Sequence, residues 1–315
     1  MKTRTLPFLI FGILFFSAAK LQAQCTCISC TGTVIVDQNV TVNFNGAVPV
    51  YSGDPDLAPF FSYDISGATP DLWKAIFDLH GNKLLVTNGA TISVTNVPAN
   101  TNNQVSPGIK ILSDCEVEVQ AGGKIIVSSK NQKAGDIIIE TNGHITINGE
   151  VRNEVTGTNG LPGALTLYSK CGNINIGGSG VVQVLGVDMG GNLLTLYTCG
   201  GSCNNGDITI SGLVKSYAHG HGGDQSLNRP NIKVVSIMGA VTVNANTTEP
   251  LFDEYSQSGT LYDIWGGLLS WTRDNAIPGK VEVQANGDIV VNGHGTDPTG
   301  PVRNSFGAIA AIATA

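Results

Sequence analysis

Aromatic side chains and carboxylates gather in one stretch of the chain, between residues 247 and 279. An aromatic ring can stack on a sugar ring, while neighbouring carboxylates accept hydrogen bonds from its hydroxyls. The stretch therefore predicts a glycan-binding surface, with the candidate residues Tyr255, Tyr262, Trp265, Trp271, Asp263 and Arg273. Two other interpretations fit the same residues. The stretch could fold onto the protein and bury its own aromatics, or two carboxylates could act as acid and base in glycoside hydrolysis if held roughly 5 to 9 Å apart.

A second interruption of the sequence pattern, residues 218–230, holds the weak metal-ligand candidates His219, His221 and Asp224. Imidazole and carboxylate groups are common ligands of divalent cations. The segment is rich in glycine and no further fixed ligand follows, so a solvated loop is the preferred interpretation. The sequence thus assigns no metal, no cofactor and no catalytic residue. Calcium is compatible with this composition but not indicated by it.

The seven cysteines all follow residue 24. In an exported protein the simplest use of cysteine is the disulfide. Cys199 and Cys203 are the best local candidates for a bridge, which would close a small loop. The cluster Cys25, Cys27 and Cys30 has the spacing to ligate a metal, but no second ligand set accompanies it. An odd number leaves at least one cysteine free or paired with another molecule.

Residues 1–24 are predicted to be a secretory signal peptide. Lys2 and Arg4 precede an apolar run from Leu6 to Phe16, which is too short to span a bilayer, and small residues follow it. Cys25 raises lipidation as an alternative. Cleavage would also remove Lys20 and move the net charge from −7 to −10. An acidic chain disfavours nucleic acid as a partner but not neutral sugars, and no later segment is long and apolar enough to cross a membrane.

The elements that must position these residues are short strands in a repeat. Seven times, a pair of aliphatic residues spaced by two is followed by a second such pair. This alternation places one apolar face on each strand, and a single unit cannot bury that face. Stacked units can, so we expect a β-solenoid with rungs of about 28 residues. The pairs are Leu84/Val86 with Ile92/Val94, Ile109/Ile111 with Val117/Val119, Ile137/Ile139 with Ile145/Ile147, Leu165/Leu167 with Ile174/Ile176, Leu194/Leu196 with Ile208/Ile210, Ile232/Val234 with Val241/Val243, and Val281/Val283 with Ile289/Val291.

Some units carry a third alternation, at Ile125/Val127 and Val182/Val184 and more weakly at Leu213. Three strands per turn predict an all-β fold, a right-handed parallel β-helix over residues 82–315, with insertions at 218–230 and 247–279. Residues 25–81 are expected to cap its first rung with their aromatics, and the spacing of Leu72, Ile76 and Leu79 predicts a helix over 71–79.

Glycine recurs just before the second strand, at Gly143, Gly172, Gly206, Gly239 and Gly287. Glycine admits the positive φ angle of a sharp corner, so we expect stacked corners. Residues 306–315 read as the first strand of another rung without a cap, which predicts that the solenoid continues in a longer chain.

The strand and turn pattern of residues 164–176 and 194–210 resembles the repeats of filamentous-haemagglutinin-like and autotransporter-like surface adhesins. The resemblance covers residues 82–315 and is architectural. It implies an exported β-helix at the outer surface of a Gram-negative-type bacterium, used for attachment to a glycan or to a host or cell-surface component. The chain has no Asn-Pro motif of the N-terminal secretion domain of such proteins, so the export route is left open.

Polysaccharide lyases and glycoside hydrolases of the pectinase type share this architecture and give the alternative function. Their chemistry needs clustered acids, or acids with lysine or arginine, on one sheet face. The outward strand positions of this chain read mainly as Thr, Asn, Lys, Ile and Val, as at Thr166, Asn175, Thr195 and Thr209. A fold alone does not confer an activity. The sequence therefore favours a structural or adhesive protein over an enzyme and leaves the enzymatic alternative open.

Overall fold

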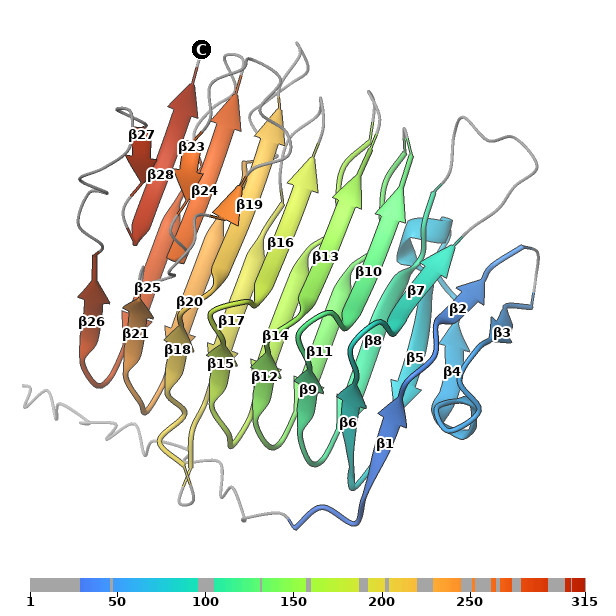
Figure 1. Cartoon of the computed structure of the whole chain (residues 1–315). Helices are drawn as coiled ribbons and strands as arrows, with labels where there is room; N and C mark the ends of the chain where they lie inside the picture. The colour runs from blue at the N-terminus through green and yellow to red at the C-terminus, as the bar shows by residue number, and fades with distance from the viewer. Residues whose placement is uncertain are drawn as a thin grey trace, which may run out of the picture.

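A computed structural model describes residues 29–45, 48–95, 105–130, 132–156, 160–186, 192–201, 204–219, 229–244, 251–252, 262–264, 267–273, 279–293, 304–306 and 308–314. The predicted signal peptide lies outside these residues. The described chain is a parallel β-helix, as predicted: three long sheets run side by side, and the chain visits them in turn (Figure 1). Among the described residues no helical segment has the length and hydropathy needed to cross a bilayer.

The three sheets, here named A, B and C, each take one strand from every rung. Sheet A runs in the order β1 (Gly32–Val36), β6 (Asn82–Val86), β9 (Val117–Val119), β12 (Ile145–Ile147), β15 (Ile174–Ile176), β18 (Ile208–Ile210), β21 (Val241–Asn244) and β26 (Ile289–Asn292). Sheet B runs β3 (Val50–Ser52), β2 (Val40–Asn43), β7 (Thr91–Thr95), β10 (Lys124–Ser129), β13 (Glu150–Val155), β16 (Val181–Gly186), β19 (Leu213–His219), β24 (Gly267–Arg273) and β28 (Ile309–Thr314). Sheet C runs β4 (Phe61–Asp64), β5 (Lys74–Asp78), β8 (Gly108–Ser113), β11 (Ile137–Thr141), β14 (Leu165–Ser169), β17 (Leu194–Thr198), β20 (Ile232–Ser236) and β25 (Val281–Ala285).

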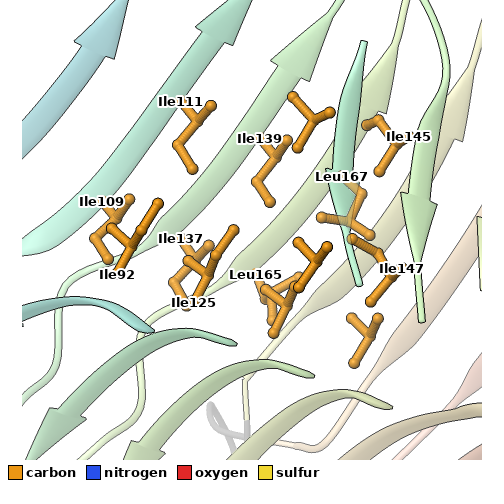
Figure 2. Packing of buried hydrophobic residues seen from close by; sticks show 14 of the residues in the cluster. Ile92, Ile109, Ile111, Ile125, Ile137, Ile139, Ile145, Ile147, Leu165 and Leu167 are labelled. Atoms are coloured by element: carbon orange, nitrogen blue, oxygen red, sulfur yellow. The ribbon is translucent and has the colours of Figure 1, made fainter. Parts of the chain in front are cut away.

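The inward side chains stack in files, which explains why the aliphatic pairs recur. Ile109, Ile137 and Leu165 occupy one register position of β8, β11 and β14, and each has no exposed surface. Figure 2 shows this file and its neighbours filling the interior. Strands in a sheet lie about 4.8 Å apart, so each side chain contacts its equivalents above and below. The predicted inward pairs of these rungs are confirmed.

Buried hydroxyls close the corner between sheets C and A. Their side chains occupy one register position at or near the C-terminal ends of successive sheet C strands, at Ser113, Thr141, Ser169, Thr198 and Ser236. Each hydroxyl donates to a backbone carbonyl of a corner; Ser169 Oγ, for example, lies 2.7 Å from the carbonyl oxygen of Gly143. These hydrogen bonds give the buried hydroxyls and the corner carbonyls partners inside the protein.

The corner glycines are needed mainly for close approach, which corrects the reason given from the sequence. Gly206 does have a positive φ of 75°, but Gly143 and Gly172 do not. A Cβ on Gly172 would lie 2.3 Å from the backbone of Gly143 in the rung before it. Only glycine allows consecutive corners to stack this tightly.

The helix predicted over 71–79 is wrong. Residues 70–72 form a single 3₁₀ turn, η2 (Pro70–Leu72), and the strand β5 follows, with Ala75 and Phe77 buried. The alternation of β5 was masked by the helical spacing of Leu72, Ile76 and Leu79. The same error shifted the first predicted unit, because Leu84/Val86 and Ile92/Val94 lie in sheets A and B, whereas the later units begin in sheet C.

An N-terminal cap is present, but the parallel ladders begin before residue 82. β1 and β2 already pair in parallel with β6 and β7. The capping elements are the antiparallel strands β3 and β4, the 3₁₀ turn η1 (Ala58–Phe60) and η2. Tyr51 and Phe61 pack at 5.4 Å between ring centroids, Phe61 lies 5.8 Å from Phe77, and both Tyr51 and Phe61 pack against the hydrophobic core.

The insertion predicted at 247–279 is not a single loop. It contains β22 (Leu251–Phe252) and β23 (Tyr262–Ile264), which form a small sheet with β27 (Asn304–Phe306), and it also contains β24, a full member of sheet B. The insertion predicted at 218–230 begins after β19, which ends at His219. β28 is likewise a sheet B strand, the third of its rung and not the first.

Candidate functional site

The outer face of sheet C carries acidic and basic side chains around a hollow. Outward positions of β5, β11 and β14 bring Asp78, Glu140 and Tyr168 into one file, since their strands pair in register through β8. Two residues further along each strand, at the corner toward sheet A, lie His80, Asp114, Asn142 and Lys170. A hollow of about 300 Å³ lies here, lined by Asp78, His80, Lys110, Leu112, Ser113, Asp114, Glu140, Asn142 and Lys170.

Ion pairs and hydrogen bonds hold the side chains of the hollow. Lys170 Nζ lies 2.8 Å from Glu140 Oε1, and His80 Nδ1 lies 3.2 Å from Asp78 Oδ1. Asn142 Nδ2 donates to Asp114 Oδ1 over 2.9 Å. These contacts cross from rung to rung, except for the His80–Asp78 pair, so the spacing of the solenoid fixes the spacing of the polar groups. The hollow thus offers both donors and acceptors in a preset arrangement.

A pair of tyrosines continues the outward file beyond the hollow. Tyr168 and Tyr197 meet edge to face at 5.3 Å between ring centroids, and the Tyr168 hydroxyl lies 3.4 Å from Cys199 Sγ. Burial, followed by the contact with Cys199, raises the pKa of the Tyr168 phenol, and burial also raises the pKa of Tyr197. Both phenols are therefore protonated at neutral pH, and they place aromatic surface beside the charged groups.

Four of the six residues predicted to form a glycan site lie among the described residues: Tyr262, Asp263, Trp271 and Arg273. Trp271 lies on β24 and only 2 % of it is exposed; it packs edge to face on Tyr217 at 5.2 Å, and Lys215 Nζ lies 5.2 Å from its ring centroid. In the described structure Trp271 is therefore a buried packing residue, and its role in glycan binding stays a prediction. Tyr262 and Asp263 lie on β23 in the small sheet, whereas Arg273 ends β24 in sheet B. Tyr255 and Trp265 lie outside the described residues.

Most of the predicted metal ligands lie outside the described residues, whereas the predicted disulfide can be compared with the structure. His219 is the last residue of β19, while His221 and Asp224 lie outside the described residues, and the described part of the chain holds no group of three potential ligands.

Cys199 is a free cysteine, so the bridge predicted between Cys199 and Cys203 is not formed; Cys203 itself is not among the described residues. Instead Cys30 pairs with Cys115, 85 residues apart, which also removes Cys30 from the N-terminal cluster considered for a metal. Cys171 is disulfide-bonded as well.

The sheet C hollow was not predicted from the sequence. The outward strand positions were described mainly as Thr, Asn, Lys, Ile and Val, which left out the acids and tyrosines of sheet C. Its members stand about one rung apart in the sequence, so no local motif contains them. The signal becomes visible when rungs are superimposed on their inward pairs: the position after the second inward residue reads Asp78, Leu112, Glu140, Tyr168 and Tyr197. Apart from Leu112 that file is charged and aromatic, and the outward file of Thr166 and Thr195 adds Lys110 to the lining of the hollow.

Comparison with known proteins adds no relative. No family model matches the chain, and neither a curated protein nor a solved structure matches it.

Proposed function

We propose that this chain is an exported structural β-helix that binds a glycan on the outer face of sheet C and serves in attachment. The observation that carries the proposal is the hollow around Glu140 and Lys170, with the tyrosine pair beside it. Sugar hydroxyls need donors and acceptors at fixed spacing, and a sugar ring needs an aromatic surface. A rigid stack of strands supplies both without a mobile loop.

Export and surface display rest on the predicted signal peptide, with support from the disulfides. A bridge between Cys30 and Cys115 joins the start of the first rung to the corner before β9. Disulfides persist in oxidising compartments. The proposed setting is therefore outside the cytoplasm, at a bacterial surface or secreted, with a glycan or cell-surface component as partner.

A polysaccharide lyase or glycoside hydrolase is the second candidate, favoured by the same hollow. Asp78, Asp114 and Glu140 lie with Lys110 and Lys170 on one sheet face, which is the type of arrangement that pectinase-like chemistry requires. Each of these acids, however, already accepts a contact from His80, Asn142 or Lys170. Such pairing suits a fixed binding surface better than a carboxyl group that must release or take up a proton.

The test is to incubate the mature chain with a panel of acidic and neutral polysaccharides, with and without calcium, and to measure retained protein and released oligosaccharide in the same tubes. Retention without release supports attachment, and released product supports the enzyme. Lys170→Ala should weaken retention at least about tenfold, equivalent to about 1.4 kcal/mol.

Lys233→Ala is the matched control for this variant. Lys233 also faces outward from sheet C, its side chain is 45 % exposed against 44 % for Lys170, and it too pairs with a glutamate, Glu282 at 3.8 Å. Equal loss of retention in both variants would contradict a site at the hollow and indicate nonspecific charge attraction.

A further inference from the structure

The outer face of sheet C carries two adjacent files of side chains that run along the solenoid axis. The first is the file from Asp78 to Tyr197 described above. The second lies two residues further along each strand, and from β5 to β17 it reads His80, Asp114, Asn142, Lys170 and Cys199. The two files together are called the sheet C strip. Figure 1 shows the strands that carry it as consecutive members of one sheet.

The sheet C strip has a defined length. On β20 the first file continues with Val235, which is only 4 % exposed, and the second continues with Ile237, so the polar character ends there. At the other end β4 runs antiparallel to β5, with Phe61 opposite Phe77, so the parallel register begins at β5. From β5 to β17 there are four strand spacings of about 4.8 Å, which makes the strip about 19 Å long.

Along the strand direction the sheet C strip is narrow. Its two files are two residues apart, which is about 6.6 Å at the rise of a strand. On one side it borders the outward file that contains Ile76 and Ile138, from which only Lys110 reaches the hollow. On the other side the chain turns through the corner into sheet A. The strip is therefore about three times as long as it is wide.

We infer that the sheet C strip binds a linear glycan lengthwise, with the sugar chain parallel to the solenoid axis; this inference rests on the proposed function. A linear glycan repeats its hydroxyls and ring faces at a constant interval, and the strip repeats its side chains at the strand spacing. Two repeating rows stay in contact over several units only when they run parallel. A sugar chain that crossed the strip at right angles would meet two outward positions and then leave the polar surface.

The side chains of the sheet C strip are already held in place by contacts between neighbouring rungs. The ion pair of Lys170 with Glu140, the hydrogen bond of Asn142 and the ring contact of Tyr168 each join one rung to the next. They still reach solvent: the Lys170 side chain is 44 % exposed and that of His80 is 75 % exposed. A ligand therefore meets a preorganised row, and little side-chain entropy is lost on binding.

The experiment measures how the affinity of the mature chain depends on the length of the sugar. The probes are oligosaccharides from the single sugar to about eight units, prepared from a linear glucan as the neutral series and from pectate as the acidic series. Calorimetric titration gives the Kd of each. In a series that binds, the Kd should fall at least about tenfold from the single sugar to the oligomer that covers about 19 Å, and should then stay level.

Variants distinguish the two directions from Tyr168. Tyr197→Ala, one rung further along the axis, should raise the Kd of the long oligomer at least about fivefold, because an aromatic surface is lost. Thr166→Ala, two residues away on the same strand as Tyr168, should change it less than about twofold. His80→Gly tests the far end without disturbing the packing: the side chain is largely exposed, glycine suits the positive φ of 49° at this position, and the Kd should rise about threefold.

The outcomes separate this inference from the proposed function. A single sugar that binds as tightly as the long oligomer, or a larger loss for Thr166→Ala than for Tyr197→Ala, would overturn the lengthwise orientation and leave glycan binding standing. Absence of binding in both series would overturn the inference together with the proposed glycan site. Melting curves by circular dichroism confirm that each variant is folded.

Discussion

At the scale of the residue, ionisation of the Tyr51 phenol makes the stability of the N-terminal cap depend on pH. Its hydroxyl donates to the backbone carbonyl of Asp54, and burial, followed by the Asp54 charge, raises the pKa of Tyr51 to about 12. The unfolded chain loses the phenolic proton near pH 10. The stability from this group is therefore complete below about pH 10 and falls as the pH rises toward about 12.

Thermal unfolding of Tyr51→Phe across this pH range tests the assignment. The variant should lose about 1 kcal/mol at neutral pH with its hydrogen bond, and its melting temperature should then fall less steeply above about pH 10 than that of the natural protein. Tyr63→Phe is the control, because Tyr63 on β4, the next strand along the chain, is 41 % exposed. An identical alkaline slope in all three proteins would refute the role of Tyr51.

The buried hydroxyls of the corners give a second prediction at this scale. Thr141 Oγ1 donates to the Cys115 carbonyl and accepts from the Gly143 amide at 3.0 Å, with 1 % of Thr141 exposed. Thr141→Val keeps the shape but leaves these groups with fewer partners, at a cost of about 1–3 kcal/mol. Thr146→Val on the outer face of β12 should change the free energy of unfolding by less than about 0.5 kcal/mol. Denaturant titration measures both, and equal effects would contradict the role of the corner hydroxyl.

At the scale of the element, the inward and outward positions of one strand should differ sharply. Ile176 of β15 has no exposed surface, whereas its neighbour Asn175 faces outward. Ile176→Asp would place an unpaired carboxylate in the stack and should cost several kcal/mol. Asn175→Asp introduces the same group outside and should be nearly neutral. Circular dichroism melts compare the two, and similar melting temperatures would show that β15 has the opposite orientation.

The elements that the sequence predicted well are those whose signal is local and repeated. Ile137, Leu165 and Leu194 could be aligned because each begins the same alternation, and they do share a register position. β5 was missed because the helical spacing of Ile76 and Leu79 was followed instead of the strand alternation of Ala75 and Phe77. β24 was missed because Gly267–Arg273 lies among residues rich in aromatics, where Trp271 resembles a binding residue until its contacts with Tyr217 and Lys215 are known. The sheet C hollow arises only from stacking, so its prediction required the register of four strands, β5, β8, β11 and β14.

At the scale of the whole molecule, a solenoid is held mainly by contacts between neighbouring rungs. The bridge between Cys30 and Cys115 adds a constraint that spans several strands, because it closes a loop across 85 residues. In the loop-entropy model such a closure stabilises the folded state by about 4.6 kcal/mol, and measured values are typically about 2–4 kcal/mol. The bridge also fixes the entry of β1 onto the stack at the end where the cap is built.

Replacing both cysteines with alanine should therefore lower the free energy of unfolding by about 2–4 kcal/mol while leaving the strand content intact. Denaturant unfolding followed by circular dichroism measures this loss, and hydrogen exchange should locate it in residues 32–43 and their partners 82–95. Cys199→Ser is the control, since Cys199 is free and its change should cost less than about 1 kcal/mol. If the double variant retained full stability, rung stacking alone would hold the N-terminal end, and the bridge would have no part in maintaining the first turn of the β-helix.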